Sequence, residues 1–278
     1  MSELYGEKFE LRLISTHGIL IHEECEDDRA QKLLERFKYD KVLFNPLTVG
    51  EYYDKLILID GANRFEALRG SGCKIILAQI VNYNSPKIQV RSWFHYVPGL
   101  SIKEVSSHLQ KNGVEFKTPG FNEFLKSINK RKINHVGIVS RQKESVCIKF
   151  SNNISEMLRG FCMLNRFYEK KYNYNRVNSE FKLRRIEDIS SKDGLLFIYP
   201  EFKKKDIIKI SGLKEKLPAG ITRHLIPNRV LHIRFPISLL KRVGDLKKRN
   251  EELQFIVDKK IEHKKVRLYK EPLLIFDE

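Results

Sequence analysis

The 278 residues include 41% hydrophobic and 31% charged side chains, a composition typical of a globular protein with a large core and two domains. The apolar runs are too short to span a bilayer, and the charged N-terminus lacks an apolar export segment. We therefore expect a cytoplasmic protein without a membrane partner. The four cysteines form no C-x-x-C pair, which excludes a typical zinc or redox motif.

The first hundred residues predict a compact α/β unit. Strand-like patterns occupy residues 10–14, 42–49, 56–59, 75–81 and 88–94, where 42–49 is either a short strand or a bend, and helical patterns occupy 28–37 and 63–69. The predicted order is β-α-β-β-α-β-β.

The junction between residues 56–59 and 63–69 is the most informative segment of the chain. An apolar strand ends at Asp60-Gly61 and a helix follows at once, with Arg64 in its first turn. A helix start attracts phosphate, Arg64 could bind phosphate oxygens, and Asp60 could hold Mg²⁺. A plain turn, with Asp60 as a helix cap, remains the alternative.

The next segment carries a helix-capping motif. Ser101 and Glu104 predict a capping box at the start of a helix that ends at Gly113. This helix resembles the first helix of a helix-turn-helix, but residues 114–120 are extended and contain Pro119. An ordinary surface helix is therefore favoured.

The rest of the chain predicts a second α/β region over residues 121–199. Its elements are strands at 136–139, 146–150 and 195–199 and a helix at 154–168. Further on we expect a strand over 230–235 and one long helix over 236–263. The apolar stripe of that helix suits either packing on the core or a dimer seam, so monomer and dimer both stay open.

Several side chains outside the turn could take part in chemistry. Glu23, in a loop, could accept the proton of a hydroxyl that attacks phosphorus, particularly if its loop meets that of Asp60 at one sheet edge. Thr222 and Arg223 follow Gly220 and supply a hydroxyl and a cation, suited to a carboxylate or phosphate. Each also has a plain reading as a solvated loop or turn. Trp93 is the single tryptophan, and the histidines show no H-x-x-x-H metal spacing.

The net charge of +17 has three explanations. DNA or RNA binding, attraction of nucleotides and other anions, and lysine-rich codon usage in an AT-rich genome would each produce it. Because the basic residues are scattered in short runs, a dedicated DNA surface is less favoured.

Five short motifs occur together in this chain. They are H-E at 22–23, I-D-G-x-x-R at 59–64, G-C-K at 72–74, S-W-F at 92–94 and P-A-G-I-T-R at 218–223. In combination they resemble the free L-serine kinases built on a ParB/sulfiredoxin-like domain. One branch is archaeal and ADP-dependent. The closer resemblance is to the ATP-dependent bacterial branch, encoded with staphyloferrin B biosynthesis, which makes O-phospho-L-serine for the diaminopropionate unit of that siderophore.

The resemblance implies an α/β (α+β) fold in three parts. Residues 1–100 would form the ParB/sulfiredoxin-like nucleotide-binding catalytic domain and 101–213 a second mixed α/β domain. Residues 214–278 would return to the active site and add a long C-terminal helix. The likeness extends over nearly the whole chain and is weakest over 121–213.

The resemblance also implies a role for each matched residue. Glu23 would be the catalytic base for the serine hydroxyl, and Asp60 would act in catalysis beside Mg²⁺ and the reacting phosphate. The phosphate-binding turn for ATP or ADP comprises Gly61, Ala62, Asn63 and Arg64. The serine pocket comprises Trp93, Thr222, Arg223 and His224, with Arg223 facing the substrate carboxylate.

One departure from the family pattern concerns Asn63, since relatives usually carry histidine there. An amide can donate to a phosphate oxygen but can neither titrate nor carry positive charge, so the chain would be a slow enzyme or would only bind nucleotide. Sulfiredoxin chemistry is excluded because Ala62 stands where a reactive cysteine is needed.

A ParB-like, DNA-binding transcriptional regulator with nucleotide binding and little kinase activity is the main alternative. The siderophore-associated branch is also described as a regulator that binds DNA and responds to haem, so DNA and haem are partners implied by resemblance alone. Glu23, Trp93 and Thr222-Arg223 favour the kinase, because a DNA clamp does not need them. An inactive paralogue, suggested only by Asn63, is a third alternative.

Overall fold

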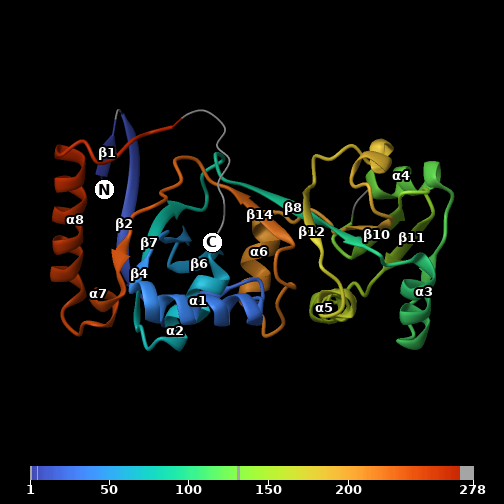
Figure 1. The fold of residues 1–278 in the computed structure, drawn as a ribbon, viewed down its shortest axis with the longest axis horizontal. Coiled ribbons are helices and arrows are strands. Elements are labelled where there is room, and N and C mark those ends of the chain that lie inside the picture. Colours follow the sequence, from blue (N-terminus) through green and yellow to red (C-terminus); the bar gives the residue numbers. More distant parts are fainter. Residues whose placement is uncertain (1, 5, 130–131, 270–278) are drawn as a thin grey trace. The chain divides into compact units, whose positions relative to one another are not determined.

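A computed structural model describes residues 2–4, 6–129 and 132–269, and the mixed α/β class expected from the sequence is confirmed (Figure 1). The chain packs into two compact units. The first lies within Met1–Ile19, Asp27–Lys87 and Ile226–Glu278, and the second comprises Leu20–Glu26 and Ile88–Leu225. The three-part division at residues 100 and 213 stays a prediction.

The first unit contains a mixed β-sheet. Its strands lie in the order β1 (Ser2–Leu4), β2 (Glu7–Ser15), β7 (Ile75–Asn82), β5 (Leu47–Tyr52) and β6 (Lys55–Asp60). Only the β5–β7 pair among these is parallel. Strand β3 (Ile19–Ile21) lies where the chain passes into the second unit.

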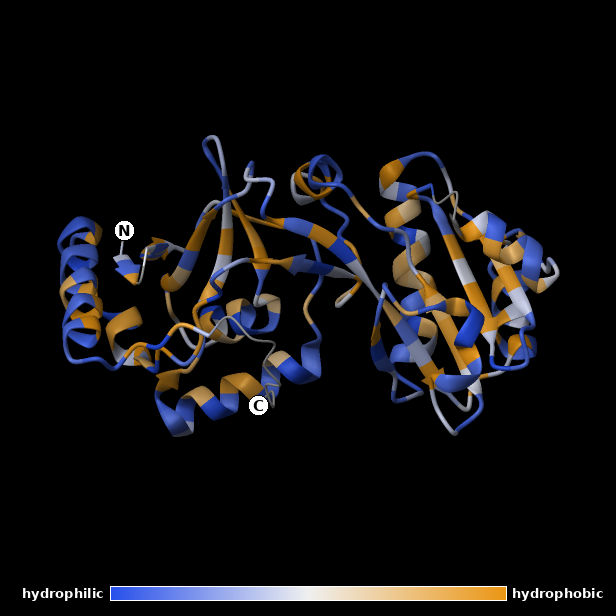
Figure 2. Cartoon of the chain, turned by 90° about the horizontal axis from the view of Figure 1, so that it is seen from above, coloured by the Kyte–Doolittle hydropathy of each residue, from blue (hydrophilic) through white to orange (hydrophobic). Residues whose placement is uncertain are grey.

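Helices pack against this sheet and against each other. Helix α1 (Asp27–Asp40) contacts α2 (Ala62–Gly70), and α8 (Leu246–Glu262) lies along β1 and β2. The middle of β7, I-L-A-Q-I, is buried throughout, as expected of a strand covered on both faces. Figure 2 shows that the strands of this sheet are largely apolar, whereas α8 is largely polar.

The strand predicted over 230–235 is wrong, because only Phe235–Pro236 (β15) is extended, paired with Val42–Leu43 (β4). His232 and Arg234 have φ of 53° and 52°, which a strand does not allow. The segment is instead a loop.

The single helix predicted over 236–263 is also wrong. Two helices form, α7 (Ile237–Lys241) and α8, and they are separated at 242–245 where Gly244 has a φ of 154°. The buried guanidinium of Arg249 donates to the carbonyls of Arg242 and Leu239 near the end of α7. The predicted apolar stripe is therefore interrupted, and Val243 is 95% exposed.

The second unit is built on an antiparallel sheet. The strand order is β12 (Asn175–Asn178), β8 (Gln89–Pro98), β13 (Gly194–Ile198), β10 (His135–Ser140), β11 (Ser145–Lys149) and β9 (Phe116–Lys117), and β14 (Thr222–Leu225) also pairs with β8. The helices are α3 (Ile102–Lys111), α4 (Phe121–Asn129), α5 (Ile154–Glu169) and α6 (Lys204–Ser211), with a 3₁₀ helix at Leu183–Asp188.

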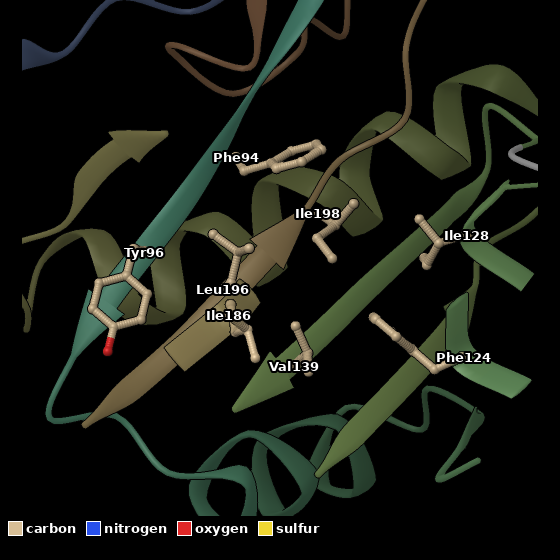
Figure 3. Packing of buried hydrophobic residues seen from close by; sticks show 8 residues of the cluster. All are labelled: Phe94, Tyr96, Phe124, Ile128, Val139, Ile186, Leu196 and Ile198. Carbon is tan, nitrogen blue, oxygen red and sulfur yellow. The ribbon is translucent and has the colours of Figure 1, made fainter. Parts of the chain in front are cut away.

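One face of this sheet carries the core shown in Figure 3. Phe94 and Tyr96 of β8 lie on this face, so the intervening His95 points to the opposite face, where it contacts Tyr168 of α5. Helix α4 approaches the sheet so closely that a Cβ at Gly137 would clash with Ile128.

Helix α3 begins with the predicted capping box at Ser101 and Glu104. A second helix, α4, does follow, but it comes after β9 and packs Phe124 and Ile128 into the core of Figure 3. A helix-turn-helix joins its helices by a turn of about 3–4 residues and exposes the second one. Residues 101–129 therefore do not form that motif.

Candidate functional site

The strand, turn and helix expected around Asp60 are confirmed. Strand β6 ends at Asp60, and Gly61 takes up a φ of 99° before α2 begins. A residue with a Cβ would be strained at that φ, so glycine permits the sharp turn. The first N–H groups of any helix lack acceptors within the helix, which makes this turn a suitable anion site.

The Asp60 carboxylate lies among guanidinium groups. Arg64 donates to Asp60 Oδ2 at 2.5 Å and also reaches the carbonyls of Asn45 and Pro46 at 3.2 and 3.1 Å. Arg229 pairs with the same carboxylate oxygen. Burial tends to raise the pKa of Asp60, but the two guanidinium groups outweigh it and hold the pKa below its usual value. Asp60 is therefore ionised at neutral pH.

Arg229 is a residue of this site that the sequence reasoning missed. Its loop is fixed by Gln79, which is 2% exposed and donates to the carbonyl of Asn228 at 2.9 Å. The Gln79 amide oxygen accepts the N–H of Val230, also at 2.9 Å. A glutamine within the apolar run of 75–81 was the available signal, because a buried amide needs hydrogen-bond partners.

The Asp60 carboxylate fits the role of a ligand for a Mg²⁺ ion that is bound mainly by the phosphates of a nucleotide. No group of three His, Cys, Asp or Glu side chains suited to a metal occurs among the residues that the structure describes. Mg²⁺ in nucleotide sites commonly uses one or two carboxylates and the substrate phosphates. Both guanidinium groups contact Oδ2 of Asp60, so Oδ1 fits the single protein ligand of such an ion.

Glu23 belongs to the second unit and is held by the chain around residue 220. Glu23 forms an isolated parallel β-bridge with Leu217, whose carbonyl accepts the N–H of Glu24 at 2.8 Å. The Glu23 carboxylate accepts the N–H of Thr222 on one oxygen and that of Gly220, at 3.3 Å, on the other. Burial raises the pKa of Glu23 to about 7, although these hydrogen bonds and Arg176 oppose the rise. A carboxylate with such a pKa suits a general base at neutral pH.

The Thr222 side chain lies in a small polar cluster. Its hydroxyl is 2.9 Å from His22 Nε2, and the His22 and His224 rings meet edge to face at 5.4 Å between centroids. All three residues are buried. The structure thus places predicted pocket residues Thr222 and His224 together, and it adds His22.

Trp93 and Arg223 are also neighbours. Strands β8 and β14 pair so that Thr222 lies opposite Ser92, and the Trp93 N–H donates to the carbonyl of Ile221 at 2.8 Å. The Arg223 guanidinium carbon lies 4.7 Å from the centre of the Trp93 ring. The aromatic face orients the cation, which can then receive a small carboxylate.

The predicted site residues therefore form two groups. The first unit holds Asp60, Gly61, Ala62, Asn63 and Arg64, and the second holds Glu23, Trp93, Thr222, Arg223 and His224. That Glu23 and the Asp60 turn serve one reaction stays a prediction, as do the individual roles.

Among the described residues, no helix combines the length and apolarity that crossing a membrane requires.

Known proteins resemble the chain over most of its length, although no protein-family model matches it. It is 24% identical over 233 residues to an "ATP-dependent L-serine kinase" of Staphylothermus marinus, covering 82% of this chain and 90% of that protein. It is 22% identical over 253 residues to "ATP-dependent L-serine kinase SbnI" of Staphylococcus aureus, covering 90% and 91%.

Solved structures share the fold. A C-terminally truncated SbnI from Staphylococcus aureus matches with a TM-score of 0.70 at 21% identity, covering 90% of this chain and 96% of that one. A free serine kinase in complex with AMP matches with a TM-score of 0.69 at 18% identity, covering 84% and 95%. The expected resemblance is therefore confirmed in both sequence and fold.

Proposed function

We propose that this chain, similar in sequence and fold to the free L-serine kinases, transfers a phosphoryl group from ATP to L-serine and forms O-phospho-L-serine. The observation that carries the proposal is the Glu23 carboxylate, with a pKa of about 7, bound by the same segment that presents Thr222 and Arg223. The segment 220–223 thus binds the base and itself supplies groups suited to an amino acid.

The phosphoryl donor would bind at the turn of the first unit. The start of α2 offers N–H groups to phosphate oxygens, and Asp60 would hold Mg²⁺, which would neutralise charge on the donor phosphates. Arg64 and Arg229 both pair with the single carboxylate of Asp60. One guanidinium can therefore bind phosphate while the other still pairs with Asp60. Asn63 can add a neutral donor.

The acceptor, L-serine, would bind at β8 and β14. Arg223, supported by Trp93, would bind the substrate carboxylate, and the buried Thr222 and His224 would orient the substrate. Glu23 would take the hydroxyl proton as the serine oxygen bonds to the γ-phosphorus and the bond from that phosphorus to the leaving ADP oxygen breaks. The products are O-phospho-L-serine, ADP and a protonated Glu23, which releases its proton to solvent.

Both substrates are cytoplasmic metabolites, so we place the enzyme in the cytoplasm. The resemblance to the siderophore-associated branch leads us to propose that the product serves diaminopropionate synthesis.

The test is to incubate the protein with Mg²⁺, L-serine and either ATP or ADP, and to measure phosphoserine by mass. We expect phosphoserine with ATP, and none when L-alanine replaces L-serine, because alanine keeps the carboxylate and amine but has no hydroxyl. Formation with ADP alone would reassign the donor. If the protein binds both nucleotides but forms phosphoserine with neither, the proposed kinase activity would be contradicted.

A DNA-binding regulator is the second candidate, and the net charge of +17 is the observation that favours it. Titration with random duplex DNA at several salt concentrations separates the two. Tight binding that weakens steeply with salt, together with no serine-dependent nucleotide consumption, would favour the regulator.

A further inference from the structure

A hydrogen-bonded network of buried polar side chains contacts the segment that binds Glu23. His95 contacts the carbonyl of Gly220 through Nε2 at 2.9 Å and the Tyr168 hydroxyl through Nδ1 at 2.7 Å. Tyr168 in turn contacts the Tyr199 hydroxyl at 2.9 Å and the Asn165 amide at 3.0 Å. All four side chains are at most 2% exposed, so they cannot contact a substrate directly.

The carbonyl at one end fixes the direction of the hydrogen bonds. A carbonyl oxygen only accepts, so His95 Nε2 must carry a proton and donate it to Gly220. Neutral His95 then accepts the Tyr168 hydroxyl proton at Nδ1. Burial lowers the pKa of His95 to about 3, so the ring is neutral at physiological pH and its Nδ1 is an acceptor.

Gly220 is held on three sides. Its N–H donates to Glu23, its carbonyl accepts from His95, and the Arg176 guanidinium occupies the space where a Cβ would lie. The φ of +71° is also one that glycine adopts without strain. Since Thr222, the other donor to Glu23, is only two residues away, the position of Gly220 sets the geometry of both donors.

We propose that His95 is a positioning residue for serine phosphorylation, because its hydrogen bond to Gly220 aims the backbone N–H groups of Gly220 and Thr222 at the Glu23 carboxylate. The inference rests on the proposed function, in which Glu23 is the base. His95 itself touches neither substrate nor base.

Loss of the His95–Gly220 hydrogen bond would change the pH dependence of turnover. The backbone N–H groups of Gly220 and Thr222 favour the ionised form of Glu23. If these hydrogen bonds lengthen, the pKa of Glu23 rises and the carboxyl group keeps its proton to a higher pH. Arg176 also favours ionisation, and it is itself paired with Glu26 and adjacent to Tyr174. Arg176 and Tyr174 also neighbour His95: Arg176 lies opposite His95 in the β12–β8 pair, and the Tyr174 ring stacks on the His95 ring at 4.5 Å between centroids. His95→Gln also lacks the ring but can keep the donor to Gly220, so it controls for the loss of these contacts.

The titratable side chains near Thr222, the other donor to Glu23, remain in His95 variants. His22 and His224 both lie beside Thr222, the first at hydrogen-bond distance from the Thr222 hydroxyl. Because their contacts are made by side chains, a His95 variant leaves them in place, and the comparison of His95→Leu with His95→Gln isolates the effect of the donor to Gly220.

The experiment is a pH profile of kcat between pH 5.5 and 9, at saturating serine and nucleotide. His95→Leu removes the donor to Gly220, whereas His95→Gln can still place an N–H near that carbonyl. For His95→Leu we expect kcat to fall about tenfold, the cost of roughly one hydrogen bond, and the midpoint of the acidic limb to rise by about half a pH unit or more. His95→Gln should remain near the wild-type midpoint.

Two further variants make the result decisive. Tyr168→Phe deletes the hydroxyl that orients the imidazole, so it should move the midpoint in the same direction and by less, which tests the inference even if His95→Leu does not fold. Phe124→Leu perturbs the core of Figure 3, on the face of the sheet opposite to His95, and should leave the midpoint unchanged.

The outcomes separate the inference from the proposed function. A wild-type acidic limb near pH 7 that neither His95→Leu nor Tyr168→Phe moves would overturn the positioning role alone. A wild-type profile without such a limb would overturn Glu23 as base, and the inference with it. A midpoint that Phe124→Leu raises as much as His95→Leu does would reduce the effect to general destabilisation and overturn the inference.

Discussion

Replacing Glu23 with glutamine removes the titrating proton of the proposed base but keeps the size of the side chain. In the folded protein burial raises the pKa of Glu23 from 4.5 to about 7. One pKa unit corresponds to about 1.4 kcal/mol, so a rise of about 2.5 units means that the ionised carboxylate costs the fold at most about 3.5 kcal/mol. Because Glu23 keeps some contact with solvent, which screens its charge, we expect a smaller cost of about 1–3 kcal/mol.

The sign of the effect follows from proton linkage. Below pH 4.5 Glu23 is protonated in both the folded and the unfolded state, so ionisation costs the fold nothing. Between pH 4.5 and 7 the folded protein binds more protons than the unfolded chain, so the stability of the wild type falls as pH rises. Glutamine has no such dependence. The free energy of unfolding of Glu23→Gln minus that of the wild type should therefore rise by about 1–3 kcal/mol between pH 4.5 and 8.

Urea unfolding at a series of pH values measures this difference. Trp93 is the single tryptophan and lies in the same unit as Glu23, so its fluorescence reports the relevant transition. Comparing differences between pH values cancels the constant cost of placing an amide NH₂ opposite a backbone N–H. In parallel, turnover should fall about 10²–10⁴-fold while the nucleotide Kd changes little. A stability difference that is flat with pH would refute the reasoning.

Four other substitutions test single contacts. Arg64→Ala should raise the nucleotide Kd about tenfold by calorimetry, and an unchanged Kd would exclude the turn as a phosphate site. Gly61→Ala should destabilise the fold by about 1 kcal/mol and weaken nucleotide binding, because its φ is 99°, whereas Gly120→Ala, in open space, should do neither. Arg223→Met should raise the KM for serine more than tenfold without changing the nucleotide Kd; equal effects on both would contradict its role. Asn63→His should raise kcat, and a lower kcat would show that the amide is the better group here.

Local signals predicted much of this structure. The turn at Asp60-Gly61 and the capping box at Ser101 were correct, because each depends on neighbours within a few residues. The helix break near Gly244 was missed, because the periodicity of the apolar side chains continues across it. That break depends on Arg249, whose guanidinium binds the carbonyls of the preceding helix end.

The candidate site shows the same limit. Glu23 and Thr222 are 199 positions apart, so their contact and the pKa near 7 that accompanies it could not be read from spacing. Arg229 was missed for a related reason, since the segment after it has an apolar pattern typical of a strand. Buried Gln79 holds that segment as a loop instead.

A single-turnover reaction tests the central claim most directly. The protein is loaded with a stoichiometric amount of ATP and Mg²⁺, L-serine is added, and phosphoserine and ADP are quantified by mass over time. The account predicts one phosphoserine for each ADP in the wild type, and bound but unreacted ATP in Glu23→Gln. ADP formed at the same rate without serine, or phosphoserine formed equally fast by the variant, would contradict it.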